Sequence, residues 1–322
     1  MKKIYSIVLL LLLILILSLF SFLAQPKTDT DDKSNNRTQI DDGNFKNDLE
    51  RLEDNQNQIL TWGHELVGVD TNIVDKKVKI AILDSGINKQ HEDLKGKVVK
   101  EYNTFTDGVT ITDEFGHGTA VAGIISANNN NYGIVGITQN VEIYDVKVLD
   151  NSGKGSMEQL IKGIKWAIEQ KVDILNISFG LQSDSRELKE LIKSALSENI
   201  IIVASAGNTY GLNVDYPAKF NDVFSISALN ENVKRASSAA KGKIDFIAPG
   251  VNVLSTDHIG GYSLFSGTSF STAYVTGVIA TILCRTNEKI NSEMMKEKLI
   301  KQSKHLGEKK EYGYGIPQLI EE

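Results

Sequence analysis

One cysteine, no long run of like charges and no internal repeat distinguish this sequence of 322 residues. Because Cys284 is alone, no intrachain disulfide can form. It ends the apolar stretch GVIATILC, and we interpret it as a buried inert thiol, because a catalytic cysteine needs polar, electropositive surroundings. The net charge of −6, without a basic block, indicates no nucleic-acid partner. A phosphate-binding loop of the form G-x-x-x-x-G-K-[ST] is also absent.

The composition is that of a globular protein with a sizeable core, since 41% of the residues are apolar and 24% are charged. The length allows one large domain or two small ones. The residue pattern divides the chain into three parts, residues 1–24, 25–57 and 58–322.

Residues 1–24 predict an N-terminal hydrophobic helix. Lys2 and Lys3 precede an uncharged apolar run, residues 4–23, that is long enough to span a bilayer. The lysines favour an N-terminus in the cytoplasm and export of everything that follows. A cleaved signal peptide usually has a shorter apolar core and small residues before the cleavage site; Ala24 fits that pattern and Phe22 does not. We therefore expect a signal peptide or, in better agreement with the pattern, an uncleaved membrane anchor, and in both cases an extracellular or membrane-anchored protein.

Residues 25–57 are rich in Asp, Asn, Lys and Gln and have almost no apolar clusters. Such a segment cannot bury enough surface to fold alone. It predicts a polar linker, with a propeptide remnant as the alternative.

From residue 58 onward, apolar strands alternate with amphipathic helices. The strand candidates are near-continuous apolar runs, which are typical of strands buried on both faces of a parallel sheet. Two segments between them have helical periodicity. The pattern predicts an α/β fold with a mostly parallel sheet and helices on both faces. The predicted strands are residues 78–83, 141–149, 172–178, 200–206 and 223–229, and the predicted helices are residues 157–170 and 185–199.

Three segments each place a polar residue where an apolar element begins or ends. Asp84 follows a strand in AILDSGIN, His117 opens a helix in DEFGHGTAVAGII, and Ser269 opens one in LFSGTSFSTAYVTGVIATIL. Strand ends and helix N-termini are where α/β folds place ligands. A serine hydroxyl attacks near neutral pH only when an oriented base takes its proton, and Asp, His and Ser suit orientation, base and attack. Taken separately, each segment has an ordinary explanation as a turn, a loop or a helix cap.

Together and in this order, the segments resemble the subtilisin-like serine peptidases, or subtilases. The family pattern reads D-[ST]-G, H-G-T-x-V-A-G and G-T-S-[MF]-[AS]-[TS]-P, and this sequence has DSG at 84, HGTAVAG at 117 and GTSFSTA at 267. The resemblance covers residues 58–319 and implies a subtilisin-like catalytic domain with Asp84, His117 and Ser269 as its triad. It implies a serine endopeptidase that hydrolyses peptide bonds through an acyl-enzyme intermediate.

Three positions depart from the family pattern, namely Ala120, Ala273 and Tyr274. Ala273 replaces a proline that shapes the start of the helix. Because alanine is a good helix former, we expect the helix to persist. None of the three is a triad position.

The resemblance also implies the groups that bind the transition state and the substrate. In ASAGN, Asn208 matches the family's side-chain amide that stabilises the developing oxyanion, with the Ser269 backbone N–H as second donor. The substrate is expected to pair as an added strand with two segments, the loop of residues 151–156 and the segment of residues 178–180. Met157 matches a position that lines an outer apolar subsite. The second segment consists of Ser178, Phe179 and Gly180.

A structural calcium site follows from the same resemblance. The family holds calcium with a glutamine near the start of the domain, an aspartate after the catalytic one, and a loop after the histidine helix. Such all-oxygen coordination suits calcium. The alternative is a polar, asparagine-rich turn without an ion. The matching residues are Gln58, Asp93, Asn128, Asn130, Tyr132 and Ile134.

Asp215 precedes a Tyr216–Pro217 pair that follows the floor of the primary specificity pocket in the family. A carboxylate there would be costly to desolvate without a partner, and an incoming cationic side chain would supply one. We therefore predict cleavage after Arg, with Lys second, because Arg bonds a carboxylate with two prongs. The alternative is that Asp215 turns into solvent or caps the adjacent turn.

The substrate is expected to be a peptide or protein, cleaved by a monomeric enzyme. The predicted anchor, the absence of a recognisable prodomain and the selective pocket resemble peptidases that remove leader peptides from lantibiotics and similar exported peptides. A general secreted protease of broad specificity is the alternative, and an inactive membrane-tethered binding protein is a third. A lipase or esterase would have a G-x-S-x-G elbow around Ser269, and the sequence has none.

Overall fold

The computed structural model describes residues 48–54, 57–106 and 108–319. All of them belong to one compact unit, Phe45–Glu322. The predicted hydrophobic helix of residues 1–24 and most of the predicted linker lie outside the described residues. Within the described part of the chain, no helix is both long and apolar enough to cross a membrane.

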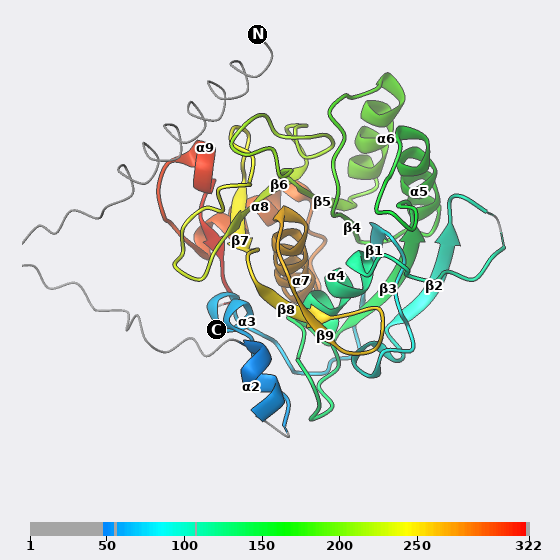
Figure 1. Ribbon diagram of the computed structural model, residues 1–322. Coiled ribbons are helices and arrows are strands. Elements are labelled where there is room, and N and C mark those ends of the chain that lie inside the picture. Colours follow the sequence, from blue (N-terminus) through cyan, green and yellow to red (C-terminus); the bar gives the residue numbers. More distant parts are fainter. Residues whose placement is uncertain (1–47, 55–56, 107, 320–322) are drawn as a thin grey trace, which may run out of the picture. The chain divides into compact units, whose positions relative to one another are not determined.

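Among the described residues, seven parallel strands form one sheet in the order β2-β3-β1-β4-β5-β6-β7 (Figure 1). The five strands predicted from apolar runs are confirmed, with small differences at their ends. The two edge strands were not predicted, because β2 is half-exposed and β7 is very short. The strands are β1 (Val78–Asp84), β2 (Val98–Asn103), β3 (Val141–Lys147), β4 (Ile174–Ile177), β5 (Ile201–Ser205), β6 (Phe224–Leu229) and β7 (Phe246–Pro249).

Helices cover both faces of the sheet, as predicted (Figure 1). Alternate residues of β1 enter different cores, because successive side chains of a strand point to opposite faces. Ile80 and Ile82 join the core under α4 and α7, whereas Ala81 and Leu83 join the core under α5 and α6. The longer helices are α4 (His117–Ser126), α5 (Met157–Glu169), α6 (Arg186–Ser197), α7 (Thr268–Arg285) and α8 (Ser292–Lys301).

Shorter elements complete the unit. The antiparallel pairs are β8 (Val253–Thr256) with β9 (Tyr262–Phe265), and β10 (Ser303–Lys304) with β11 (Ile316–Pro317). The short helices are α2 (Asp48–Asp54), α3 (Trp62–Val67), α9 (Lys309–Tyr312) and the 3-10 helix η1 (Glu92–Leu94).

Capping residues set the starts of the two predicted helices. The Ser156 hydroxyl accepts the Gln159 N–H at the start of α5, and the Ser185 hydroxyl accepts the Leu188 N–H at the start of α6. Each bond satisfies an amide that has no partner within the helix. Helix α7 runs without a break through Ala273, which confirms that alanine continues the helix.

The order of the strands makes the carboxyl ends of the neighbouring strands β1 and β4 a topological switch point. The chain leaves β1 toward β2 and β3 on one side, and it leaves β4 toward β5 on the other. Where connections diverge from neighbouring strands, α/β folds bind their ligands. Asp84 is the last residue of β1 and Ser178 directly follows β4. The topology therefore brings two predicted site residues to this switch point.

Part of the predicted linker is instead a helix, α2, that packs on the folded unit. Asp48 is buried, and its Oδ2 accepts the Trp62 N–H at 3.0 Å while its Oδ1 accepts from Arg51 at 2.8 Å. Leu49 and Leu52 pack against a small apolar cluster. The described residues 48–54 therefore pack against the domain, and the division of the chain at residue 57 stays a prediction. The polar composition concealed this helix, since its stability comes from partners distant in sequence.

His64, in α3, is a fully buried histidine that the sequence pattern does not single out. Its Nδ1 lies 2.6 Å from Thr61 Oγ1, and its Nε2 lies 3.3 Å from the Ile124 carbonyl oxygen. Because a carbonyl can only accept, Nε2 carries the proton and Nδ1 accepts from the Thr61 hydroxyl. Burial lowers the pKa of His64 to about 4, although the hydrogen bond to Ile124 acts to raise it.

We expect the free energy of unfolding to decrease as the pH falls from 6.5 to about 4. In this window the unfolded chain binds a proton at His64 that the folded chain does not bind, so stability is present above the window and is lost on acidification. The contribution is on the order of 3 kcal/mol. In denaturant unfolding, His64→Gln should show a shallower pH dependence, and the exposed His305→Gln should keep the wild-type slope. Equal slopes for wild type and His64→Gln would contradict the prediction.

Candidate active site

Asp84 and His117 form a hydrogen-bonded pair at the centre of the site. Asp84 ends β1 and is fully buried, and His117 is the first residue of α4. His117 Nδ1 lies 2.7 Å from Asp84 Oδ1, which also accepts the Ser85 N–H at 2.8 Å. Burial acts to lower the pKa of His117, but the charge and hydrogen bond of Asp84 outweigh it, and the charge of Asp113 adds to the rise. The Asp84 bond holds the proton on Nδ1 and leaves Nε2 as the basic atom.

Ser269 is the second residue of α7 and lines the same cavity as His117, with a volume of about 240 Å³. Its Oγ donates to the Ser178 carbonyl oxygen at 2.5 Å. Among the hydrogen bonds of the described residues, none joins this Oγ to His117. The His117 ring lies against the ring of Phe270, the residue after Ser269, with ring centroids 5.0 Å apart. A turn of the Ser269 side chain away from Ser178 is therefore needed to engage the base, as is common before substrate binds.

A buried chain of hydrogen bonds fixes the start of α7 against β4. Asn176 Nδ2 donates to Ser178 Oγ, and Thr276 Oγ1 donates to Asn176 Oδ1, both at 2.8 Å. Ser178 Oγ in turn donates to the Ser269 carbonyl oxygen at 3.3 Å. Because these buried polar groups satisfy one another, the serine is held by both a strand end and a helix.

Asn208 also lines this cavity, and a hydrogen bond from the start of α7 sets the orientation of its side chain. Its Oδ1 accepts the Thr268 N–H at 3.1 Å, so Nδ2 with its two hydrogens stays available to a ligand. A Cβ on Gly267 would lie 3.2 Å from Nδ2, which would crowd this amide. The cavity lining includes both Asn208 and Ser269.

The Asp215 side chain points into the cavity between two glycines. A Cβ on Gly180 would lie 2.4 Å from Asp215 Cβ, and a Cβ on Gly207 would lie 2.3 Å from Asp215 Oδ2. No hydrogen bond or ion pair from the described residues reaches the carboxylate. Burial raises the pKa of the Asp215 carboxyl, while the charge of Lys219 acts to lower it. The carboxylate thus lines the cavity and has no hydrogen-bond or ion-pair partner among the described residues.

The segment around Asp215 is held on both sides. Tyr216 and Leu181 exchange two backbone hydrogen bonds of 2.8 Å, which join this segment to the chain after β4. Lys243 closes the following turn: its Nζ donates to the Ala218 carbonyl at 3.1 Å and to the Val223 carbonyl, and it pairs with Asp245, directly before β7, at 2.6 Å. The three hydrogens of the Lys243 ammonium are therefore used by two carbonyl oxygens of this turn and by one carboxylate.

The predicted substrate-binding residues do not all lie in the cavity. Ser178, Phe179 and Gly180 line it on one side and Gly153 lines it on the other. Met157 is not among the lining residues; it begins α5 and packs, half-buried, on the core under α5 and α6, as Phe179 also does.

Oxygen atoms of the predicted calcium residues converge on one atom, Gln58 Nε2. The carbonyl oxygens of Asn128, Tyr132 and Ile134 lie 2.6, 2.9 and 2.7 Å from it, and Asn130 Oδ1 lies at 3.4 Å. An amide group has only two hydrogens, so four oxygens exceed what it can serve. The sixth residue, Asp93, accepts from Asn130 Nδ2 at 2.9 Å. The donor set is all oxygen, which fits calcium. Among the described residues, no group of three or more His, Cys, Asp or Glu side chains is placed to hold a metal ion.

Phe115 is a residue of the site that the sequence reasoning did not identify. It is 45% exposed, lines the cavity, and stacks on the His117 ring with centroids 6.2 Å apart. Its place in the cavity wall beside the imidazole would let it contact a substrate. The available signal was an aromatic residue two positions before the histidine in DEFGHG.

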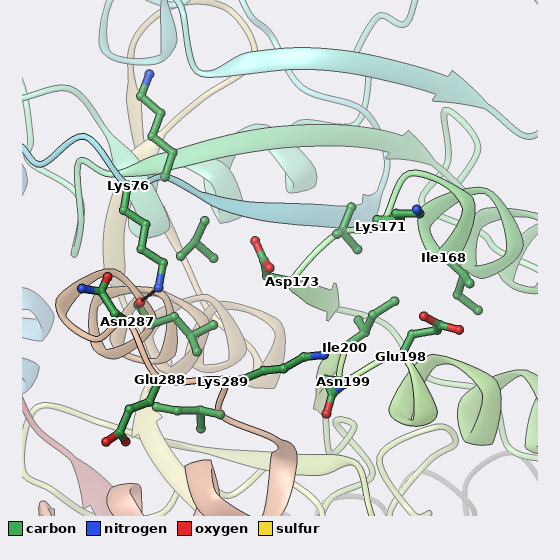
Figure 2. Close-up of a pocket in the computed structure, with 15 residues that line it drawn as sticks. Lys76, Ile168, Lys171, Asp173, Glu198, Asn199, Ile200, Asn287, Glu288 and Lys289 are labelled. Atoms are coloured by element: carbon green, nitrogen blue, oxygen red, sulfur yellow. Dashed lines mark hydrogen bonds between the residues drawn. The ribbon is translucent and has the colours of Figure 1, made fainter.

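A second hollow, of about 470 Å³, lies at the amino ends of the strands (Figure 2). Val78 at the start of β1 and Ile200 before β5 line it, so it is at the opposite end of the sheet from Asp84. Lys76 reaches carbonyl oxygens at the end of α7, at 2.6 Å for Leu283 and 2.5 Å for Thr286. None of the predicted site residues lines this hollow, and its rim mixes lysines with carboxylates, so it favours no single class of ligand.

The parallel sheet, the Asp84–His117 pair and the serine at the start of α7 place Asp, His and Ser, the residue types of a serine-hydrolase triad, at one site of an α/β fold. The chain belongs to the subtilase family, whose model matches residues 75–315. This confirms the family predicted from the motifs.

Individual relatives are similar over most of this chain. Subtilisin amylosacchariticus of Bacillus subtilis subsp. amylosacchariticus is 37% identical over 249 residues, which cover 74% of this chain and 64% of that protein. The minor extracellular protease Epr of Bacillus subtilis is 38% identical over 252 residues, 76% of this chain and 38% of that protein. The thermostable alkaline protease of Halalkalibacterium halodurans is 34% identical over 264 residues, 80% of this chain and 72% of that protein. The chain thus spans less than two thirds of the length of the first two relatives.

Proposed function

We propose that this chain is a serine endopeptidase in which Ser269 is the nucleophile, His117 the general base and Asp84 the residue that orients the base. The observation that carries the proposal is the 2.7 Å bond between Asp84 and His117 in a cavity that Ser269 also lines. Family membership and the names of the relatives, which are proteases and subtilisins, support it.

In the proposed reaction, Ser269 Oγ attacks the carbonyl carbon of the scissile bond and its proton passes to His117 Nε2. Asp84 stabilises the imidazolium through the Nδ1–H bond without taking the proton. Asn208 Nδ2 and the Ser269 N–H donate to the oxyanion of the tetrahedral intermediate. The imidazolium then protonates the leaving amine, and water, activated by His117, hydrolyses the acyl-enzyme.

Ser269→Ala should abolish peptide hydrolysis and labelling by a fluorophosphonate probe while the protein stays folded, because no other group can form the acyl-enzyme. Adding His117→Ala or Asp84→Ala to it should cost little more, since the three residues act as a unit. Ser237→Ala removes an exposed serine outside the cavity and should keep full activity. Turnover by folded Ser269→Ala would refute the assignment, and absence of labelling in the wild type would favour the inactive binding protein.

The substrate is proposed to lie as an extended strand between residues 178–180 and the loop of residues 151–156, with the side chain before the scissile bond next to Asp215. The unpaired, half-buried carboxylate supports a cationic side chain there, Arg before Lys, because the guanidinium can bond both oxygens. The two flanking glycines leave room for the Asp215 side chain itself, because a Cβ on Gly180 or Gly207 would lie 2.4 or 2.3 Å from it. Met157 is proposed for an outer apolar subsite.

Asp215→Asn, which keeps the shape and removes the charge, should lower the preference for Arg over Phe by about 2–5 kcal/mol, the range for loss of one partner of a buried charge pair. The measurement is kcat/KM on matched peptides with Arg, Lys, Phe or Leu before the scissile bond. Asp222→Asn changes an exposed carboxylate of the following turn and should leave the preference intact. A wild-type preference for Phe or Leu would end the specificity proposal without affecting the triad.

A single charged determinant supports a processing role over broad digestion. We propose a basic-residue site in an exported peptide, such as the leader junction of a lantibiotic precursor, as the natural substrate. The enzyme would act outside the cytoplasm, either held in the membrane by residues 1–24 or released after cleavage of that segment. It would act as a monomer, because all proposed catalytic groups come from one chain. A relative named as an extracellular protease supports the location.

We further propose that calcium binds among the oxygen atoms around the Gln58 amide, which we call the oxygen cage. Gln58, Asp93 and Asn130 would contribute side chains, and Asn128, Tyr132 and Ile134 would contribute carbonyl oxygens. Calcium would stabilise the loop after α4 and the first residues of the domain. The amide of Gln58 can turn to present Oε1 in place of Nε2, which supplies a further oxygen.

Removal of calcium with EGTA should lower the melting temperature, and calcium should restore it. At a free concentration a hundredfold above Kd the ion contributes about 2.7 kcal/mol. Asn130→Ala should lose this response, whereas Asn129→Ala, in the same loop but with no side-chain bond to the cage, should keep it. An identical melting temperature for the wild type with EGTA and with calcium would exclude an occupied site.

A further inference from the structure

The first turn of α4 receives its cap from a residue four positions before His117, where the helix begins. Gly116, the N-cap residue, has no side chain, so the N-terminal amides need another acceptor. Asp113 is 7% exposed and supplies it. Its Oδ1 accepts the N–H of Gly116 at 2.8 Å and that of Phe115 at 3.2 Å. Its Oδ2 accepts the Thr119 N–H at 3.0 Å and the Thr119 hydroxyl at 2.6 Å.

The same carboxylate also binds the turn that carries Asp84. The Ser85 hydroxyl donates to Asp113 Oδ1 at 2.8 Å and accepts the Gly118 N–H at 3.0 Å. Ser85 follows Asp84 directly, and its own N–H donates to Asp84 Oδ1 at 2.8 Å. Asp113 is therefore bonded on one side to the helix that begins with His117 and on the other to the turn that begins with Asp84.

The charged groups around Asp113 come from three elements. Lys147, at the end of β3, donates to the carbonyl oxygens of Ser85 and Thr112, so its ammonium lies under both segments. Asp145, on the same strand, has a pKa well above its usual range because of its burial, and the charges of Glu101, Asp113 and Asp84 add to the rise. Asp84 and His117 are the remaining neighbours. The negative charge of Asp113 is met by amides of α4, which favour a carboxylate at a helix N-terminus.

We propose that Asp113 is a positioning residue of the peptidase, an inference that rests on the proposed function: it fixes the turn of Asp84 and the helix of His117 in one geometry. Its charge also favours the imidazolium that His117 becomes when Ser269 gives up its proton, in line with the effect of Asp113 on the pKa of His117. A role in folding alone would stabilise the protein and leave the catalytic base unchanged.

The decisive variants are Asp113→Asn and Ser85→Ala. Asparagine removes the charge and turns an NH₂ group toward amide donors, while Ser85→Ala keeps the charge and cuts the link to the Asp84 turn. Asp257→Asn is the matched control: Asp257 is also 7% exposed and caps a turn through the N–H groups of Ile259 and Gly261, with no bond to the triad. Thr119→Ser keeps both bonds of Thr119 to Asp113 and is the conservative variant.

The measurements are kcat and KM per titrated active site, and the pKa of His117 from an NMR titration. Asp113→Asn and Ser85→Ala should lower kcat by about 10- to 100-fold with little change in KM, because misplacement of the base acts on the transition state. Asp113→Asn should also lower the pKa of His117. Asp257→Asn should lose stability only, and Thr119→Ser should match the wild type.

Folded Asp113→Asn and Ser85→Ala proteins with wild-type kcat per site would overturn the proposal, as would an unmoved pKa of His117 in Asp113→Asn. If Asp113→Asn does not fold, Ser85→Ala decides. The NMR titration does not require turnover. An inactive, unlabelled wild type would therefore refute the peptidase, while the pKa of His117 would still report whether Asp113 acts on it.

Discussion

The contact between the carboxyl end of β1 and the first turn of α4 is the constraint on which the site depends. The Asp84–His117 bond spans it, and the backbones must nearly touch for the bond to form. A Cβ on Gly118 would lie 2.2 Å from the Gly86 carbonyl oxygen, so no other residue fits at that position without moving the helix. The glycine after the histidine is thus required by geometry. The remaining features of the site, including the start of α7, are arranged around this close approach.

The close contact between β1 and α4 brings the carboxylates of Asp84, Asp113 and Asp145 near one another, and the structure limits their repulsion in three ways. Asp84 binds His117 and a backbone amide, and Asp113 binds only hydrogen-bond donors. Asp145 has a raised pKa, mainly from burial, which favours its neutral form and removes a charge from the group. Lys147 lies beneath the two loops and bonds their carbonyl oxygens. Charges that would otherwise separate β1 from α4 are therefore balanced or neutralised within a few residues.

The sequence predicted the centre of the sheet and the local motifs far better than the interactions between distant segments. Five strands follow from apolar runs, because strands covered on both faces have no polar side. The edge strand β2, VVKEYN, lacks that signal, since none of its residues is fully buried. Asp113 and Lys243 gave no signal either: their partners lie on loops that come together only in the fold. Helix α2 escaped for the same reason, because Asp48 is stabilised by the Trp62 amide fourteen positions later.

The carboxylates of the domain differ in whether the fold supplies their partners, and this difference bears on specificity. Asp93, Asp113 and Asp245 each receive three or more hydrogen bonds or ion pairs from other parts of the fold. Asp215 receives none from the described residues, although two glycines and a paired backbone segment hold it inside a cavity. A partly buried carboxylate without a partner costs free energy in the empty protein. Such a cost is offset when a ligand brings the missing cation, so the contrast with the three satisfied aspartates supports Asp215 as a group kept for the substrate.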